Sequence, residues 1–258
     1  MRVKTAIILC GGKGTRLGSI SKRIPKTLVK IQKKEILWYI LNFLKKNGFN
    51  HFILPLGYKS KKIRAYVKKN NFFNTQIDLM DTGINTNIGE RIYKVLKKAK
   101  SENILILNGD AIFNFNIESI FDNHEKNNTD ATFLSAESKY QFGTVCIKKG
   151  KLIDFQRNIT FESVNVRNSK SMKAFNYAGL IILKRVRLLK HSKIYKNSDS
   201  FEKVFYPVLI KKYKTKIERI NGLFHSVDNM KDIQLANIKS NDKTYKKIKK
   251  TKINLLKI

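Results

Sequence analysis

A glycine-rich loop near the start of the chain carries the residue types that bind phosphate. Residues 11–17 read Gly-Gly-Lys-Gly-Thr-Arg-Leu and directly follow a run of apolar residues. Glycines allow several backbone N–H groups to approach one anion closely. Thr15 adds a hydroxyl, Arg16 adds a fork-shaped cation for phosphate oxygens, and Lys26 can reach back over the loop as a point charge. These residues predict a polyphosphate site.

The spacing of this loop differs from that of the two common phosphate loops. Walker A ends in Gly-Lys-Ser/Thr, whereas Gly12-Lys13 is followed here by Gly14. The dinucleotide fingerprint has its third glycine where Arg16 and Leu17 stand. A glycine turn without any ligand is the alternative interpretation, but such turns seldom combine the glycines with Thr, Arg and a later Pro-Lys pair.

Asp110 is the first candidate for a carboxylate that binds a metal ion beside this loop. It follows Asn108-Gly109 after a buried strand predicted over 103–107. Mg²⁺ prefers oxygen ligands and can bridge phosphate oxygens to such a carboxylate. Asn-Gly-Asp is also a turn sequence, so a purely structural aspartate is the alternative. Taken alone, this motif supports a magnesium ligand and a structural aspartate equally.

The apolar pattern predicts the elements that position these residues. Strands are predicted over 6–10, 51–56, 76–80 and 103–107, and helices over 35–47, 61–69 and from 89 onward. Strands that alternate with helices form a parallel sheet with right-handed crossovers, and ligands bind beyond the carboxyl ends of its strands. The glycine loop, Asp81-Thr82-Gly83 and Asp110 each follow such an end, so we expect the three motifs to converge.

The second half of the chain changes character. Strands are predicted over 131–136, 143–147, 151–156, 178–183, 215–219 and 223–227, and helices over 117–125, 201–212 and 228–237. Residues 157–175 are predicted to be polar and irregular, and Asp199 or Ser200 is expected to cap the helix over 201–212. We expect one domain over 1–237, followed by a lysine-rich tail over 238–258.

The chain of 258 residues is strongly basic, with 53 Lys and Arg against 19 Asp and Glu and a formal net charge of +34. The lysines are spread over nearly every segment, which favours a compositional bias of the genome over a nucleic-acid groove, so nucleic acid is not predicted as a partner. No apolar run is long enough to span a bilayer, and the first strand begins too early for a signal peptide. Cys10 and Cys146 form no metal or disulfide pattern, so a cytoplasmic location is expected. The sequence leaves a homo-oligomer open.

The motifs resemble those of the sugar-phosphate nucleotidyltransferases, which join a nucleoside triphosphate to a sugar 1-phosphate and release pyrophosphate. The matching motifs follow the family's order over roughly residues 3–236. They are the glycine loop with Pro25-Lys26, Ile36-Leu37-Trp38-Tyr39-Ile40, Gly57-Tyr58-Lys59, Asp81-Thr82-Gly83, Gly89-Glu90-Arg91, Asn108-Gly109-Asp110, Phe142-Gly143 and Val227-Asp228. The resemblance implies a Rossmann-like, GT-A-like α/β fold, in which a mixed, mostly parallel sheet is flanked by helices and carries a small β-rich region on the acceptor side.

In the nucleotide half, the resemblance gives each motif a role. Arg16 and the loop N–H groups would hold the triphosphate, Lys26 would neutralise the α-phosphate, and Asp110 and Asp228 would bind Mg²⁺. Asp228 also opens a predicted helix, where capping explains it equally well. The implied catalytic residues are Arg16, Lys26 and Asp110. The implied nucleotide-binding residues are Leu9, Gly11, Gly12, Gly14, Thr15, Arg16, Lys26, Thr82, Gly83 and Gly89.

The identity of the base rests on the resemblance alone. The Leu-Trp pair, Gly-Tyr-Lys and the stretch from Asp81 to Arg91 look most like the glucose-1-phosphate cytidylyltransferase branch. CTP is therefore the favoured triphosphate, although the bare chemistry of these residues does not separate cytosine from other bases.

In the acceptor half, the sequence departs from the family. The family carries a Glu-Lys-Pro run whose lysine holds the acceptor phosphate, whereas residues 155–159 read Phe-Gln-Arg-Asn-Ile. Arg157, Arg167 or Lys173 could replace the lost charge. Tyr177 stands where the family has a small polar residue. The implied substrate-binding residues are Gly143, Arg157, Tyr177 and Glu202.

Three hypotheses of function follow. The leading one is a magnesium-dependent transferase that couples CTP to a sugar 1-phosphate, giving an NDP-sugar for surface polysaccharide synthesis. A second keeps the nucleotidyl transfer but changes the acceptor to a phosphorylated amino-acid derivative or polyol. A third is a non-catalytic module that binds nucleotide or RNA, which the charge of +34 and the altered acceptor half favour.

Overall fold

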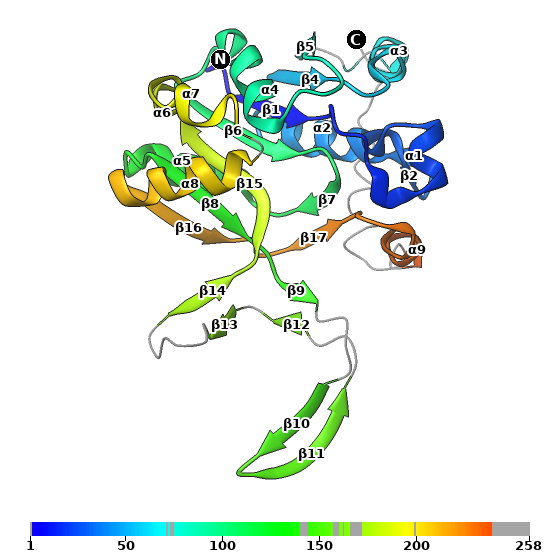
Figure 1. Ribbon diagram of the computed structural model, residues 1–258, viewed down its shortest axis with the longest axis vertical. Coiled ribbons are helices and arrows are strands. Elements are labelled where there is room, and N and C mark those ends of the chain that lie inside the picture. Colours follow the sequence, from blue (N-terminus) through cyan, green and yellow to red (C-terminus); the bar gives the residue numbers. More distant parts are fainter. Residues whose placement is uncertain are drawn as a thin grey trace.

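The computed structural model describes residues 2–70, 72, 75–139, 144–156, 160–161, 163–165, 172–198 and 200–238. Figure 1 shows an α/β body built around a twisted sheet, with an arm of short strands that projects from it. The predicted tail over 238–258 stays a prediction, because residues 239–258 lie outside the described residues. Within the described ranges, every helix is too short or too polar to span a bilayer.

The body is built on one mixed sheet. Its strands are β1 Thr5–Leu9, β4 His51–Leu56, β5 Gln76–Asp81, β6 Asn103–Asn108, β8 Ala131–Ser135, β15 Tyr177–Lys184 and β16 Thr215–Arg219. They lie in the order β16-β8-β15-β6-β1-β4-β5. β15 runs antiparallel to both β6 and β8, whereas the other paired strands of this sheet are parallel. The predicted mixed, mostly parallel sheet is therefore confirmed.

Helices connect and cover these strands. The α-helices are α1 Ser19–Arg23, α2 Ile36–Lys46, α3 Ser60–Asn70, α4 Ile88–Val95, α5 Ile117–Lys126, α6 Arg185–Lys190, α7 Ser192–Tyr195, α8 Phe201–Lys212 and α9 Met230–Ile238. Single turns of 3₁₀ helix are η1 Thr15–Leu17, η2 Lys26–Leu28 and η3 Leu96–Lys98. The predicted longer helices are confirmed, whereas the short α1, α6 and α7 were not predicted.

Two helix starts show how side chains set the bounds. Ser200 caps α8, since its hydroxyl accepts the N–H of Lys203 at 3.4 Å, while Asp199, the other predicted cap, lies outside the described residues. The helix predicted from residue 228 begins instead at Met230. The carboxylate of Asp232 accepts the N–H groups of Asp228 and Asn229, which precede the helix. Those two residues are therefore held outside the helix as a cap.

Two apolar layers cover the two faces of the sheet. Successive residues of a strand point to opposite faces, so Ala6 and Ile8 of β1 pack in one layer and Ile7 in the other. The first layer includes residues of α2, α3 and α5, and the second includes residues of α4, α6, α7 and α8. In Figure 1, α8 lies in front of the sheet and α2 behind it. Because both faces are covered, the central strands read as continuous apolar runs.

The arm is made of short strands between Ser138 and Phe175. They are β9 Ser138–Lys139, β10 Thr144–Lys148, β11 Lys151–Gln156, β12 Thr160–Phe161, β13 Ser163–Asn165 and β14 Lys173–Phe175. The prediction of irregular structure over 157–175 is wrong in part, because β12 pairs with β9 and β13 pairs with β14. These strands pair through backbone N–H and C=O groups, whatever their side chains are. Because the segment is polar, it lacks the alternation of apolar and polar residues from which strands are predicted.

Several strand ends meet at the edge of the sheet where the motifs singled out in the sequence lie. The parallel strands β1, β5 and β6 end at Leu9, Asp81 and Asn108. Because β15 runs the other way, its first residue, Tyr177, lies at the same edge. The glycine loop, Thr82-Gly83 and Asp110 therefore converge as expected.

Candidate active site

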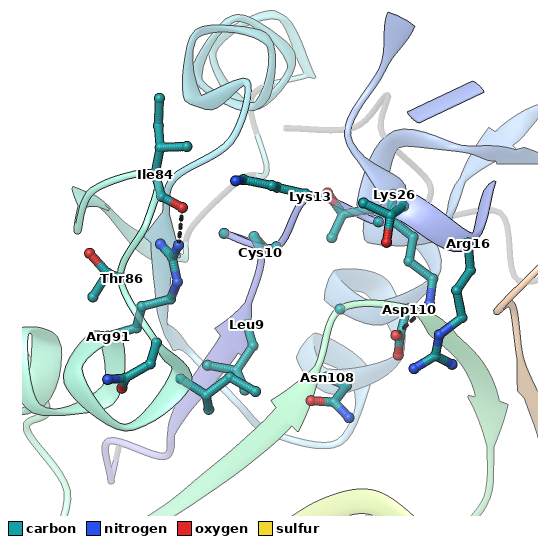
Figure 2. Close-up of a pocket in the computed structure, with 18 of the residues that line it drawn as sticks. Leu9, Cys10, Lys13, Arg16, Lys26, Ile84, Thr86, Arg91, Asn108 and Asp110 are labelled. Atoms are coloured by element: carbon teal, nitrogen blue, oxygen red, sulfur yellow. Dashed lines mark hydrogen bonds and ion pairs between the residues drawn. The ribbon is translucent and has the colours of Figure 1, made fainter. Parts of the chain in front are cut away.

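A cavity of about 710 Å³ opens at the carboxyl edge of the sheet. A volume of this size is typical of small-molecule sites. The charged residues that line it are Lys13, Arg16, Lys26, Arg91, Asp110 and Asp228. Figure 2 shows Lys26, Arg16 and Asp110 together on one side of the cavity, and Arg91, Ile84 and Thr86 on the other.

The glycine loop connects β1 to η1 and forms part of the cavity wall. Gly14 has a φ of +63°, in the left-handed region that favours glycine. Its carbonyl accepts the N–H of Leu17 at 3.0 Å, which closes the turn of η1. Within the described residues, the backbone N–H groups of Gly11 to Thr15 donate to no other backbone group. Unpaired N–H groups in a loop that lines a cavity can bind an anion.

Lys26 joins the two predicted metal ligands. Its ammonium Nζ lies 2.8 Å from Asp110 Oδ2 and 2.9 Å from Asp228 Oδ1. Arg16 Nη1 lies 3.2 Å from the same Asp228 oxygen. The Lys26 side chain is 16% exposed, so water screens these contacts less than it screens a surface ion pair. The structure thus brings Arg16, Lys26, Asp110 and Asp228 to one point of the cavity.

A short antiparallel ribbon brings the two aspartates together from distant parts of the chain. β7 (Ala111–Asn114) pairs with β17 (Leu223–Ser226), with Ala111 opposite Ser226. Just beyond the ribbon, the N–H of Val227 donates to the carbonyl oxygen of Asp110 at 2.9 Å. Asp110 and Asp228 therefore leave the ribbon at the same end.

The local partners of Asp228 keep its carboxylate charged. Ser226 Oγ donates to Asp228 Oδ2 at 2.7 Å. Burial alone would raise the pKa of Asp228, but the hydrogen bonds from Ser226 and Lys26, with the charges of Lys26 and Arg16, outweigh it and lower the pKa. A charged carboxylate is the form that binds a metal ion.

The two carboxylates fit a divalent cation. The ammonium group of Lys26 lies between them and contacts one oxygen of each. Mg²⁺ is commonly bound through one or two carboxylates together with substrate phosphates. The described residues contain no group of three or more His, Cys, Asp or Glu side chains that could hold a metal. Asp110 and Asp228 would therefore need phosphate oxygens to complete the coordination.

Arg91 was matched as part of a motif in the sequence, but no role was predicted for it. This α4 residue is 4% exposed, yet it lines the cavity. Its Nη1 donates to Leu56 O at 3.2 Å and to Thr82 Oγ1 at 2.7 Å, and its Nη2 donates to Ile84 O at 3.1 Å. Burial lowers the pKa of Arg91, although nearby carboxylates oppose this, and a guanidinium remains protonated in proteins. Arg91 thus ties the end of β4 to the loop over 82–87.

Two glycines make room for this guanidinium. A Cβ on Gly11 would lie 2.3 Å from Arg91 Nη1, and a Cβ on Gly57 would lie 2.4 Å from the same atom. Both distances are far below van der Waals contact, so a side chain at either place would displace Arg91. These two glycines were the signal in the sequence, but they stand on different strand ends and identify Arg91 only once the fold is known.

Three of the predicted nucleotide-binding residues do not line the cavity. Thr82, Gly83 and Gly89 are absent from the lining, whereas the predicted residues of the glycine loop line it. Thr82 is buried, and its hydroxyl donates to Leu56 O at 2.7 Å. Gly89 packs against α7, since a Cβ there would lie 2.2 Å from the carbonyl oxygen of Tyr195. Thr82 and Gly89 therefore shape the site from outside the cavity.

The predicted acceptor residues are only partly described. Gly143, Arg157 and Arg167 lie outside the described residues. The Tyr177 hydroxyl lies 2.8 Å from that of Tyr206, and burial is the main cause that raises the pKa of both phenols. Both rings pack edge-on against Phe133.

Glu202 lies near this aromatic group, and Asn108 lies beside Gly179 of β15, the strand that also bears Tyr177. The Glu202 charge also raises the pKa of Tyr177 and Tyr206, so its carboxylate is close to them. Asn108 lines the cavity, and a Cβ on Gly179 would lie 2.6 Å from its amide nitrogen. The predicted substrate-binding residues Tyr177 and Glu202 themselves are not among the residues that line this cavity.

Comparisons with known proteins agree with this geometry. Residues 5–162 match the nucleotidyl transferase family. The chain is 31% identical over 179 residues to a probable glucose-1-phosphate cytidylyltransferase of Bacillus subtilis, a match that covers 62% of this chain and 70% of that protein. It is 32% identical over 178 residues to D-glycero-alpha-D-manno-heptose 1-phosphate guanylyltransferase of Campylobacter jejuni, covering 68% of this chain and 72% of that protein.

Solved structures show the same fold. HddC from Yersinia pseudotuberculosis complexed with GMP-PN matches with a TM-score of 0.64 and 22% identity, covering 92% of this chain and 99% of that one. A putative glucose-1-phosphate thymidylyltransferase from Bacillus anthracis in complex with a sucrose matches with a TM-score of 0.72 and 16% identity, covering 93% and 96%. The structural likeness establishes the GT-A-like fold, and the sequence match over more than half of the chain establishes the family. The protein therefore belongs to the nucleotidyl transferase family.

Proposed function

We propose that the protein is a magnesium-dependent nucleotidyltransferase that couples CTP to a sugar 1-phosphate and releases pyrophosphate. The observation that carries this proposal is the contact of Lys26 with both Asp110 and Asp228, beside a glycine loop with unpaired N–H groups. Transfer between two phosphates needs positioning and charge neutralisation more than a covalent nucleophile. A cavity that combines cations, loop amides and two carboxylates supplies both.

In the proposed reaction, a phosphate oxygen of the acceptor attacks the α-phosphorus of the triphosphate. A new P–O bond forms there, the bond from the α-phosphorus to the bridging oxygen breaks, and pyrophosphate leaves with that electron pair. The glycine loop and Arg16 hold the triphosphate and stabilise the charge on the departing pyrophosphate. Lys26, whose ammonium lies within 2.9 Å of both aspartates, neutralises the α-phosphate during the attack.

Asp110 and Asp228 would hold the magnesium ion. The ion neutralises phosphate charge when bound, which lowers the repulsion between the two reacting anions. The lowered pKa of Asp228 supports this assignment, because the carboxylate is charged at neutral pH.

The base is proposed to be cytosine. Relatives named as cytidylyltransferases include those of Bacillus subtilis and of Salmonella typhimurium, the latter 30% identical over 175 residues, whereas others are named as guanylyltransferases. Arg91 uses three of its N–H groups within the protein, and a guanidinium has five. The remaining donors suit a base with two adjacent acceptors, such as O2 and N3 of cytosine or O6 and N7 of guanine, better than uracil, which carries a hydrogen at N3. The choice of cytosine over guanine rests on the motif resemblance. Ile84 and Ile88 line the cavity with exposed apolar surface, which suits the ring of a base.

The acceptor is proposed to be a sugar 1-phosphate, since the relatives are named for such substrates. An NDP-sugar formed in this way is an activated donor, and surface polysaccharide synthesis in the cytoplasm is the use proposed for it. A second candidate is a phosphorylated acceptor that is not a sugar, such as an amino-acid derivative or a polyol. The sequence over 155–159 favours it, because Phe-Gln-Arg-Asn-Ile stands there in place of the Glu-Lys-Pro run whose lysine holds the acceptor phosphate in the family.

Pyrophosphate release tests the proposal. The purified protein is incubated with Mg²⁺, one of the four nucleoside triphosphates and one acceptor from a panel of sugar 1-phosphates, polyol phosphates and phosphorylated amino-acid derivatives. We expect release above background only with CTP and an acceptor, and none in the Asp110→Asn variant. Release with a different triphosphate would overturn the base assignment. Nucleotide binding without release for every pair would favour a non-catalytic binding module.

A further inference from the structure

The Lys26 ammonium stands where the proposed metal would have to bind. It lies 2.8 Å from one Asp110 oxygen and 2.9 Å from one Asp228 oxygen. These distances are ordinary for charge-assisted hydrogen bonds, so both carboxylates already have a cationic partner. The Lys26 side chain is 16% exposed, whereas those of Asp110 and Asp228 are 27% and 37% exposed. The lysine therefore lies deeper than the carboxylates that it joins.

We propose that Lys26 is an internal counter-cation that excludes a divalent metal from Asp110 and Asp228 until a triphosphate enters the cavity. The inference rests on the proposed function, because it deepens the role of the same site by giving the order in which its ligands bind. Free metal binds poorly, since it must displace the ammonium. Metal and triphosphate bind together, since the triphosphate gives the ammonium a new partner.

The charges around the two carboxylates support this order. Lys26 contacts both Asp110 and Asp228, whereas Arg16, which also contacts Asp228, is 78% exposed and is screened by water. Lys26 is therefore the main counter-charge of the two carboxylates. A divalent ion added to this group would create a net positive charge in a partly buried site, which is unfavourable. A triphosphate brings several negative charges to the glycine loop and removes that excess. Metal and triphosphate therefore favour the binding of each other, and the coupling is reciprocal.

The position of the Lys26 stem allows the ammonium to change partners. Lys26 is the first residue of η2, and a Cβ on Gly14 would lie 3.2 Å from Lys26 Cβ and 3.9 Å from Lys26 Cδ. The stem therefore runs alongside the glycine loop, where the triphosphate would lie. A change of side-chain rotamer is enough to carry the ammonium from the aspartates to a phosphate on that loop, and a lysine has four flexible carbons for this movement.

Binding of Mn²⁺ alone, followed by electron paramagnetic resonance of the free ion, tests the inference without any turnover. We expect the wild-type protein to bind Mn²⁺ weakly when nucleotide is absent. The Lys26→Met variant, which keeps the stem and removes the charge, should bind Mn²⁺ about tenfold or more tighter, because charge-assisted hydrogen bonds no longer compete with the metal. The added Asp228→Asn change in the Lys26→Met variant should abolish that gain, which locates the metal at the two carboxylates.

The Lys13→Met variant is the matched control. Lys13 lines the same cavity but has no ion pair within the described residues, so its loss removes one charge without freeing the aspartates. We expect its Mn²⁺ affinity to stay close to that of the wild type. An equal gain in both variants would show a general charge effect and would overturn the inference.

Two further outcomes would also overturn it. One is tight Mn²⁺ binding by the wild-type protein without nucleotide, which needs no variant and so does not depend on whether Lys26→Met folds. The other is a folded Lys26→Met variant, as judged by circular dichroism, with unchanged Mn²⁺ affinity. Both outcomes are independent of pyrophosphate release, so a failure of this inference is distinguishable from a failure of the proposed function.

Discussion

The backbone N–H of Val227 donates to the carbonyl oxygen of Asp110 at 2.9 Å, although the two residues come from opposite halves of the chain. This bond extends the ribbon of β7 and β17 and fixes the next residue, Asp228, beside Asp110. The site therefore depends on long-range pairing of two short strands, and a change in their register would separate the two carboxylates.

Replacement of Asp110 by Asn tests the proposed metal ligand. The change keeps the size of the side chain and removes its charge. Loss of an outer partner of a metal ligand typically costs about 10–100-fold in activity, so loss of a ligand itself should cost at least about 100-fold in turnover. Asp122→Asn is the control, because this aspartate is 61% exposed and pairs with Lys4 on the surface. Pyrophosphate release and melting temperature should be measured for both, and substantial activity in folded Asp110→Asn would argue against the metal role.

Gly11→Ala tests whether Arg91 needs the space beside the glycine loop. A Cβ at Gly11 would lie 2.3 Å from Arg91 Nη1, whereas a Cβ at Gly12 would meet nothing within 4 Å. Overpacking of this kind costs roughly 1–3 kcal/mol, so Gly11→Ala should lower the free energy of unfolding by that amount. Gly12→Ala should leave it nearly unchanged. Urea denaturation of the two variants measures the difference, and equal stabilities would contradict the described packing.

A double-mutant cycle separates this contact from a general effect of alanine. In an Arg91→Met background, the guanidinium that overlaps the new methyl group is absent. Gly11→Ala should therefore cost much less in that background, with a coupling energy of about 0.5–3 kcal/mol. A cost of Gly11→Ala that is independent of residue 91 would show that strain in the loop, and not Arg91, limits this position.

Lys26→Met should affect turnover more than triphosphate affinity. The Lys26 charge is needed most as negative charge develops during the attack, so its loss should lower kcat by about 100-fold or more. The dissociation constant of CTP should change by less than about tenfold, because Arg16 and the loop amides still bind the triphosphate. Steady-state kinetics and calorimetric titration measure the two quantities. The reverse pattern would assign Lys26 to ground-state binding only.

His124 should make the protein less stable on mild acidification. Its Nδ1 lies 2.8 Å from Thr132 Oγ1 and its Nε2 lies 3.3 Å from Asn103 Oδ1, inside the body. Burial, with the charges of Lys216 and Lys184, lowers its pKa from 6.5 to about 4. Between these two pKa values, the unfolded chain binds a proton at His124 that the folded chain does not bind. The contribution of His124 to the free energy of unfolding is therefore fully present above pH 6.5 and is lost as the pH falls toward about 4.

The expected slope is up to about 1.4 kcal/mol per pH unit for this one residue. Urea denaturation at several values between pH 7 and pH 5 measures it, and His124→Gln should flatten the dependence. An identical slope in a folded His124→Gln variant would show that other groups set the acid sensitivity.

Local signals were enough to predict one part of the site. The glycine loop and Asp110 follow apolar strands directly, and parallel strands place such ends at one edge of a sheet. The resemblance added Asp228, whose own neighbours allow a helix cap just as well. In the structure, Asp228 and Asp110 meet at Lys26 because β7 pairs with β17. The sequence of these two short apolar segments did not indicate that they pair or in which register.

Other parts could not be predicted from local pattern. Arg91 looks like an ordinary charged residue of a helix, and its burial depends on space left by Gly11 and Gly57 in other segments. α6 and α7, of six and four residues, are too short to give a helical period. Thr82 follows a predicted strand and Gly89 begins a predicted helix, as expected. Thr82 contacts Arg91 and Gly89 contacts Tyr195, and neither lines the cavity.

Transfer of a radioactive label tests the central claim most directly. The protein is given CTP labelled at the α-phosphate or at the γ-phosphate, with Mg²⁺ and the acceptor that supports pyrophosphate release, and the products are separated. Attack at the α-phosphorus predicts that the α-label enters the new diphosphate-linked product and that the γ-label leaves in pyrophosphate. A γ-label on the acceptor, or release of the γ-label as free phosphate, would contradict the assignment of this cavity to nucleotidyl transfer.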